Sequence, residues 1–140
     1  MSQSAGQRGA ALIEVLVAAV IFVLVTLGLT SSTLNAKRSA DGSRHAAEAT
    51  TLAFDKLEQL RTLDPSDSAL SAGAHADSLN PMTVTGTSGG IFTRTWTVTT
   101  LTSVSPALTA GAMARVDTRV SWPTNGGAGS VTLVGYYKML

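Results

Sequence analysis

One acidic residue lies inside an otherwise apolar stretch, and its type and position suggest chemistry. From Ala10 to Leu29 the only ionisable side chain is Glu14. A carboxylate in a membrane-spanning helix costs roughly 2.5–3.5 kcal/mol at the helix centre and less near an end, so such a residue usually has a partner and a function. Arg8 and Gly9 come just before the stretch. Cleavage after Gly9 would expose the amine of Ala10 about one helical turn from Glu14, where the two charges could meet each other or neighbouring chains.

The stretch is long enough to cross a membrane. About twenty residues at the helical rise reach about 30 Å, the thickness of the hydrocarbon core of a bilayer. An ordinary secretory signal has a shorter apolar part, and no Ala-x-Ala cleavage site follows this one. We therefore expect residues 10–30 to form a membrane-spanning helix that stays with the protein.

The histidines and aspartates lack the spacing of known metal or catalytic sites. His45 and His75 have no histidine partner at ligand spacing, and we interpret them as surface residues. Asp64, Asp67 and Asp77 do not follow the spacing of a calcium loop, which favours turn and capping roles. The chain has no cysteine, so a disulfide, a thiolate metal site and a cysteine nucleophile are excluded.

Two further groups of residues favour structural roles. The glycine-rich segment 126–129 has no Gly-Lys-Ser/Thr after it, so we interpret it as part of a flexible hairpin loop, longer than two residues, and not as a phosphate-binding loop. Arg94, Arg115 and Arg119 could contact phosphate, but a solvated strand face is the interpretation that we favour. We expect no catalytic residue, no metal and no cofactor, and hence no enzyme.

Composition limits the size and the partners of the protein. The chain has 140 residues, enough for one small domain and a membrane segment. Its formal net charge is +1, which offers no general attraction to nucleic acid or to an anionic membrane. Basic residues lie on both sides of the apolar stretch, Arg8 before it and Lys37 and Arg38 after it, so the positive-inside rule predicts no clear orientation.

The pattern predicts one helix from the apolar stretch to Leu63. No proline occurs between Ala10 and Asp64, and Pro65 disfavours further helix. Gly28 and Gly42 are the positions where we expect any bend or break.

The second half of this helix is amphipathic. Small and apolar residues recur at helical spacing on one face, namely Ala46, Ala49, Ala53, Leu57 and Leu60. Leu52 and Leu63 fall on a different side, which predicts a second surface covered by other subunits. A helix packed wholly within its own domain is the alternative.

The remainder of the chain predicts an antiparallel sheet. Residues 92–99 and 114–122 alternate between apolar and polar side chains, which is typical of half-buried strands, and Val131, Leu133 and Tyr137 share one face of a third strand. Residues 82–85 are a candidate edge strand, and residues 66–80 are expected to form a loop, with at most a short helical turn. A sheet of this kind needs cover on its apolar face, and the amphipathic helix supplies it. The predicted fold class is α+β, a long amino-terminal helix packed on a three- to four-stranded antiparallel sheet.

The amino terminus resembles the class III signal of type IV pilins and type II secretion pseudopilins. The residues that carry the resemblance are a short basic leader ending in Gly9, an apolar helix, and the run Leu12–Ala18, which reads LIEVLVA. The family most often has Phe at the position of Ala10 and Thr at the position of Ala11. The order of helix and sheet is similar to the pilin fold.

Other segments resemble particular subfamilies. Residues 52–61, 94–98 and 116–122 are most similar to V-type minor pilins and I-type minor pseudopilins. The resemblance implies a domain organisation of a cleaved leader at 1–9, a filament-core half of the helix at 10–30, an amphipathic half at 31–63, and a loop with a β-sheet domain at 64–140.

The resemblance also implies a function. A prepilin peptidase would cut after Gly9 and methylate Ala10, and the subunit would pass from the bacterial inner membrane, with its leader in the cytoplasm, into a filament through an assembly platform. Glu14 would pair with the amine of an adjacent subunit, and Ala10–Leu29 would pack against equivalent helices. A minor pilin in or near the tip complex, serving adhesion, motility or DNA uptake at the cell surface, is the first expectation. A periplasmic type II secretion pseudopilin and a signal-anchored adhesin that keeps residues 1–9 are the alternatives.

Overall fold

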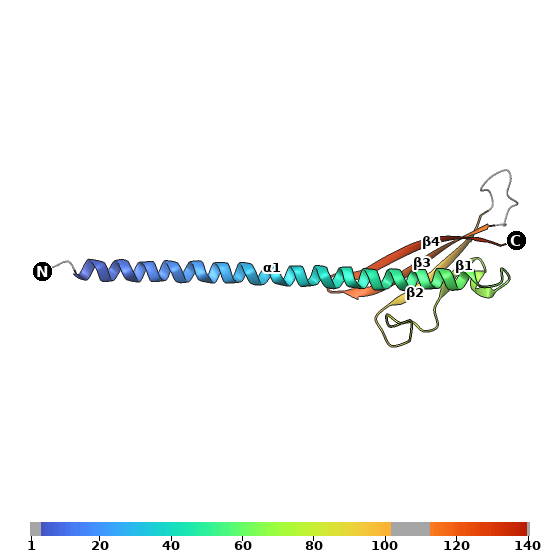
Figure 1. Cartoon of the computed structure of the whole chain (residues 1–140), viewed down its shortest axis with the longest axis horizontal. Helices are drawn as coiled ribbons and strands as arrows, with labels where there is room; N and C mark the ends of the chain where they lie inside the picture. Colours follow the sequence, from blue (N-terminus) through green and yellow to red (C-terminus); the bar gives the residue numbers. More distant parts are fainter. Residues whose placement is uncertain (1–3, 102–112, 140) are drawn as a thin grey trace. The chain divides into compact units, whose positions relative to one another are not determined.

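The chain folds into one long helix followed by a four-stranded antiparallel sheet (Figure 1). This computed structural model describes residues 4–101 and 113–139, and side chains from residue 11 onward within those ranges. The elements are α1 (Ser4–Arg61), the 3-10 helix η1 (Ser68–Leu70), β1 (Gly73–Ala76), β2 (Thr93–Thr100), β3 (Met113–Thr124) and β4 (Gly127–Lys138). The strands lie in the order β1-β2-β3-β4, and every neighbouring pair is antiparallel. The α+β prediction is confirmed.

The chain divides into two compact units, Met1–Asp41 and Gly42–Leu140. The division falls at Gly42, one of the two glycines at which a bend or break was expected. The backbone nevertheless stays helical through both Gly28 and Gly42. The first unit is helical over all of its described residues, and the second contains the end of α1 and the whole sheet.

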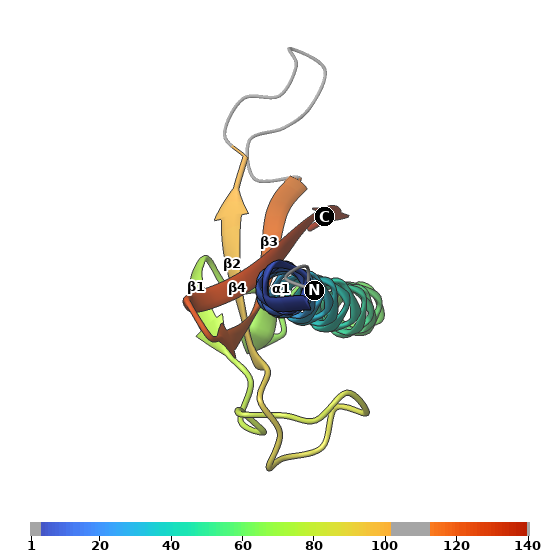
Figure 2. The ribbon, with the colours of Figure 1, turned by 90° about the vertical axis from the view of Figure 1, so that its left-hand side faces the viewer.

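In the second unit, α1 packs on the sheet through the predicted apolar face. Figure 2 looks along the helix and shows the strands beside it. Two adjoining groups of buried side chains form the core. One group includes Leu57, Leu60, Trp96 and Val116, and the other includes Ala49, Leu52, Ala53, Phe92 and Trp122. The alternating burial along β2 and β3 follows from the period of two in their sequences.

The prediction of a second helix surface at Leu52 and Leu63 is wrong. Leu52 is only 1% exposed and belongs to the core, and Leu63 packs against it. The buried stripe is wide because the sheet twists beneath the helix and contacts more than one row of side chains. The large apolar side chain that α1 does leave exposed in this unit is Phe54, at 56%.

The prediction of an edge strand at residues 82–85 is also wrong. Met82 forms isolated bridges with Ser88 and Phe92, and the chain between them turns back on itself. The strand at that edge of the sheet is β1, which lies within the segment expected to be a loop. Its residues Gly-Ala-His-Ala carry no large apolar side chain, so no alternation marked them as a strand.

Two boundaries differ from expectation. The β3–β4 connection is a two-residue turn at Asn125 and Gly126, since Thr124 at the end of β3 pairs with Gly127 and β4 begins within the glycine-rich segment. The prediction of a longer loop is therefore wrong. The helix ends at Arg61, with a hydrogen-bonded turn to Leu63 before Pro65, close to the expected position.

Candidate functional site

Glu14 lies on α1 in the first unit, with its side chain exposed. Among the groups that the structure describes, none forms an ion pair or a hydrogen bond with the side-chain carboxylate of Glu14. Its neighbours along the helix are large apolar residues, among them Leu12, Ile13 and Leu16, each 66–72% exposed. Among the described residues, then, this carboxylate is left open to solvent, to a headgroup or to another polypeptide.

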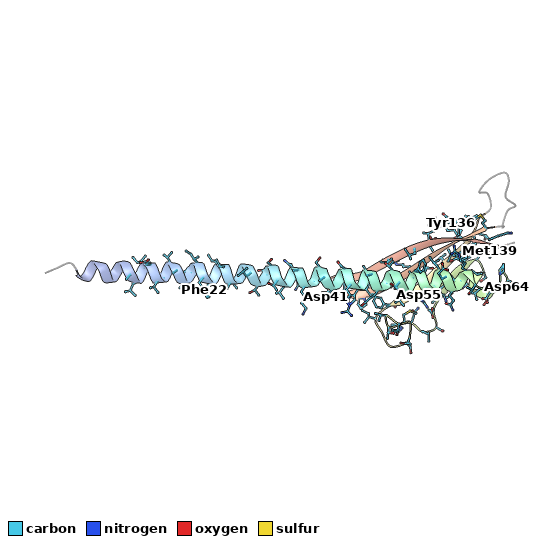
Figure 3. All side chains as sticks on the ribbon, in the orientation of Figure 1. Phe22, Asp41, Asp55, Asp64, Tyr136 and Met139 are labelled. Carbon is cyan, nitrogen blue, oxygen red and sulfur yellow. The ribbon has the colours of Figure 1, made fainter. Side chains whose placement is uncertain are left out.

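The helix around Glu14 exposes an apolar surface on every side. Large apolar side chains from Leu12 to Leu34 are 49–72% exposed, and Figure 3 shows one of them, Phe22, projecting from the ribbon. One helix in the described part of the chain is long and apolar enough to cross a membrane, and its most apolar window is not buried at all. A helix that is apolar all round is stable in lipid or among other helices and not in water.

Gly9 and Ala10, the predicted cleavage residues, lie within the helical backbone of α1, which begins at Ser4. The helix therefore starts before the expected leader ends. A peptide bond inside an α-helix is hydrogen-bonded along the helix axis, so a peptidase that cuts between these residues must first unwind this end.

The second unit contains a buried ionic cluster that sequence analysis missed. Arg94 on β2 is 8% exposed, and its Nη2 lies 2.6 Å from Oδ2 of Asp77. Its Nη1 donates to the carbonyl oxygen of Leu52 on α1 at 2.9 Å. Lys56 on α1 lies 3.6 Å from the same Asp77 oxygen. One guanidinium therefore connects the loop after β1, the strand and the helix.

The expectation that Arg94 belongs to a solvated strand face is wrong. Its place in the alternation, between Thr93 and Thr95, puts its side chain on the inner face of the sheet with Trp96. The alternation along β2 already placed Arg94 on the same face as Trp96. Its charge, and the threonines on either side of it, instead favoured a prediction of the solvent-exposed face. Arg115 and Arg119 are exposed, and Arg115 pairs with Asp117 at 2.7 Å.

The electrostatics of the cluster favour the ionised form of Asp77 but not that of Lys56. Burial raises the pKa of Asp77, but the hydrogen bonds from Arg94 and Leu79 and the charges of Arg94 and Lys56 outweigh burial, so the pKa lies below its ordinary value. Burial lowers the pKa of Lys56 more than the charge of Asp77 raises it. The carboxylate thus stays charged and holds two cations.

Trp96 is enclosed by this cluster. Lys56 Nζ lies 4.0 Å from the centre of its ring, and the ring of His75 stacks on it with centroids 5.3 Å apart. Its indole nitrogen donates to the carbonyl of Ala69 at 2.8 Å. His75, which was expected at the surface, is half-buried, and its stacking on Trp96 helps to attach β1 to the core.

The acidic residues near the end of α1 show the expected turn and capping contacts. Asp64 accepts hydrogen bonds from the backbone and the hydroxyl of Ser66, and Asp67 caps η1 through the amide of Ala69. Asp77 accepts from Leu79 at 3.4 Å, but its main contacts are ionic. Within the described ranges, no three histidine, aspartate or glutamate side chains gather to hold a metal ion.

A groove of about 340 Å³ lies between the end of α1 and β4. Its walls include Phe54, Leu57 and Glu58 on the helix and Val134 and Tyr136 on the strand. Phe54, Val134 and Tyr136 are 45–57% exposed, so apolar surface borders the groove on both sides. β4 is an edge strand that pairs only with β3 in the described sheet.

Compared with models of known protein families, with curated proteins and with solved structures, the chain matches none significantly. Arguments about its function therefore depend on its own residues and on their arrangement.

Proposed function

We propose that the protein is a minor pilin of a type IV pilus, cut after Gly9 and incorporated into or near the tip complex that primes filament assembly. The observation that carries the proposal is the exposed apolar helix with Glu14 as its only ionisable residue between Ala10 and Leu29. Such a surface is incompatible with water but well suited to two environments in turn, a bilayer before assembly and a bundle of like helices after it. The α+β domain that follows supports the same proposal.

Glu14 has the role of pairing with the amine of Ala10 on an adjacent subunit. Two opposite charges in an apolar bundle cost less together than apart, because each offsets part of the desolvation penalty of the other. Methylation of the amine leaves its charge in place, so the pair persists in the modified subunit. The absence of a partner for Glu14 among the described residues is consistent with a partner on another chain.

The second unit supplies contacts outside the filament core. The groove bordered by Phe54, Val134 and Tyr136 has exposed apolar side chains on both its helix wall and its strand wall, and we assign it to neighbouring subunits. The ionic cluster holds α1, β2 and the loop after β1 together, so that a pull on the helix is transmitted to the whole domain.

The mass of the mature protein tests the proposal. Protein recovered from sheared filaments and from membranes should begin at Ala10 and carry one added methyl group, as measured by intact-mass spectrometry. The matched control is a Gly9→Val variant, which should keep residues 1–9 and stay in the membrane. Filament or membrane material that still carries its leader would overturn the proposal and favour a signal-anchored adhesin.

A second experiment separates the pilus from a type II secretion pseudopilus. Deletion of the protein should abolish or reduce surface piliation and leave exoprotein secretion unchanged. Loss of secretion with normal piliation would assign the protein to the secretion system as a minor pseudopilin.

A further inference from the structure

The spacing of charges along α1 matches the thickness of a bilayer. Glu14 and the pair Lys37 and Arg38 enclose a stretch, residues 15–36, with no ionisable side chain. These residues, about 22 in number, reach about 33 Å at the helical rise. The hydrocarbon core of a bilayer is about 30 Å thick. An acid therefore lies at one end of a membrane-length stretch and two bases lie at the other.

Several hydroxyl residues near the end of this stretch are hydrogen-bonded within the helix. Three hydroxyl groups donate to backbone carbonyls one turn earlier at 2.7–2.9 Å, namely Thr30 to Thr26, Ser31 to Leu27 and Thr33 to Leu29. A hydroxyl whose proton is bound within the helix enters hydrocarbon at lower cost than a free one. Leu34, which is 51% exposed, adds a large apolar side chain after them. The apolar surface therefore extends beyond residue 30.

Lys37 and Arg38 are available to bind anions from outside the chain. Both side chains are exposed. Within the part of the chain that the structure describes, neither side chain forms an ion pair or a hydrogen bond. The next basic residue, Arg44, instead donates to Glu48 at 2.8 Å. An ammonium and a guanidinium each bind phosphate, and both side chains are long enough to reach along the helix to a membrane surface.

We propose that Lys37 and Arg38 bind the phosphodiester headgroups of anionic phospholipids and so hold residues 15–36 across the hydrocarbon. Glu14 then lies at the opposite interface, where water and headgroups solvate its charge. The carboxylate loses this hydration only when the subunit leaves the bilayer, which is when a partner amine becomes necessary. The inference rests on the membrane stage of the proposed function and on neither cleavage nor filament assembly.

Cysteine labelling locates the boundary. Because the chain has no cysteine, single variants of the full-length protein can be reconstituted into phosphatidylcholine–phosphatidylglycerol vesicles and treated with a membrane-impermeant maleimide. Ser32→Cys should be protected as strongly as Ile21→Cys, whereas Asp41→Cys should react, and all three should react in a denaturing detergent. Labelling of Ser32→Cys at the rate of Asp41→Cys would overturn the proposed boundary.

Lipid retention tests the headgroup site. Protein extracted from the same vesicles in a mild detergent should retain several-fold more phosphatidylglycerol, relative to phosphatidylcholine, than the vesicles contain, as measured by mass spectrometry. A Lys37→Gln, Arg38→Gln double variant should lose this enrichment, and the control Arg44→Gln should keep it. No enrichment in the unmodified protein would overturn lipid binding, and equal enrichment in the double variant would overturn the assignment to these residues.

The labelling and lipid-retention experiments can succeed or fail independently of the experiments that test the proposed function. The vesicles contain no peptidase and no assembly platform, so the lipid experiments succeed or fail without cleavage. A protein that keeps its leader in cells while passing both vesicle tests would overturn the pilin proposal and leave the headgroup site standing.

Discussion

Two carboxylates in this chain meet the cost of an apolar environment in different ways. Asp77 lies between Lys56 and Arg94 in the core of its own domain, with its charge neutralised locally. Glu14 has no such contact among the described residues and lies on an apolar helix. The first arrangement belongs to the fold, and the second leaves a carboxylate without a counter-charge among the described residues. The two residues therefore call for different experiments.

Replacing Glu14 by Ala or Val should leave membrane insertion and cleavage intact and reduce incorporation into filaments by about tenfold or more. The reason is that an amine left unpaired in an apolar bundle costs about 3–5 kcal/mol. Quantitative immunoblots of sheared filaments and of membranes measure the two pools, with Asp41→Asn as the exposed-acid control. Normal incorporation of both Glu14 variants would remove the proposed role.

Replacing Asp77 by Asn should lower the free energy of unfolding by about 3–5 kcal/mol, because Lys56 and Arg94 would become buried cations without a counter-charge. Asp117→Asn is the control, since its partner Arg115 is partly exposed and the pair contributes about 0–1 kcal/mol. Chemical unfolding of the full chain in detergent, followed by tryptophan fluorescence, measures both. Equal effects of the two substitutions would contradict the assigned importance of the cluster.

The lowered pKa of Asp77 predicts how stability changes with pH. A carboxyl that holds its proton less tightly in the folded state contributes stability above its ordinary pKa of about 4. That contribution is lost as the pH falls through the lower pKa of the folded state. Unfolding curves collected from neutral to acid pH should show this loss in the unmodified protein and a weaker dependence in Asp77→Asn. If the free energy of unfolding changed with pH in the same way in both proteins, a group other than Asp77 would control the loss of stability at acid pH.

At the scale of elements, the contact between α1 and β4 depends on a residue without a side chain. A Cβ on Gly135 would lie 2.9 Å from Cε2 of Tyr137 and 3.1 Å from Cδ2 of Leu57. The hydroxyl of Tyr137 also donates to the backbone carbonyl of Leu57 at 2.7 Å, which fixes the separation of helix and strand. The close approach leaves little room for a methyl group at this position.

We therefore expect Gly135→Ala to lower the free energy of unfolding by about 1–3 kcal/mol through overpacking. Gly126→Ala is the matched control, because no atom lies within 4 Å of the added Cβ in the turn between β3 and β4. Thermal unfolding followed by circular dichroism compares them. A larger loss for Gly126→Ala than for Gly135→Ala would contradict the packing argument.

At the scale of the whole molecule, the two units differ in the environment that they require. The described core residues lie between Ala46 and Met139, and none of them comes from the first unit. The first unit presents apolar surface for lipid or for other helices, and the second buries its own core. Folding of the second unit should therefore not depend on the first.

A fragment of residues 42–140 should be soluble and should fold, with a free energy of unfolding within about 1 kcal/mol of that of the full chain, since mutational effects at distant sites are independent. Circular dichroism and chemical unfolding of the fragment test this, and the Asp77→Asn substitution should destabilise fragment and full chain equally. A fragment that fails to fold would show that residues 1–41 contribute to the core.

Sequence periodicity predicted those parts of the fold in which apolar side chains recur with the period of a helix or of a strand. The helix, expected to end at Leu63 and found to end at Arg61, and the three long strands follow from repeats of 3.6 and 2, which each segment carries within itself. The apolar surface around Glu14 follows in the same way, because a stretch that is apolar on every side cannot be buried in so small a domain.

Tertiary structure alone decided the parts that depend on residues distant in the sequence. β1 is a strand because β2 offers it a free edge, and its own side chains do not mark it. Arg94 is buried because Asp77, 17 residues away, and Leu52, 42 residues away, satisfy its charge and its donors. A local pattern records which side chains are apolar, whereas the burial of a charge depends on a partner that only the folded chain brings within reach.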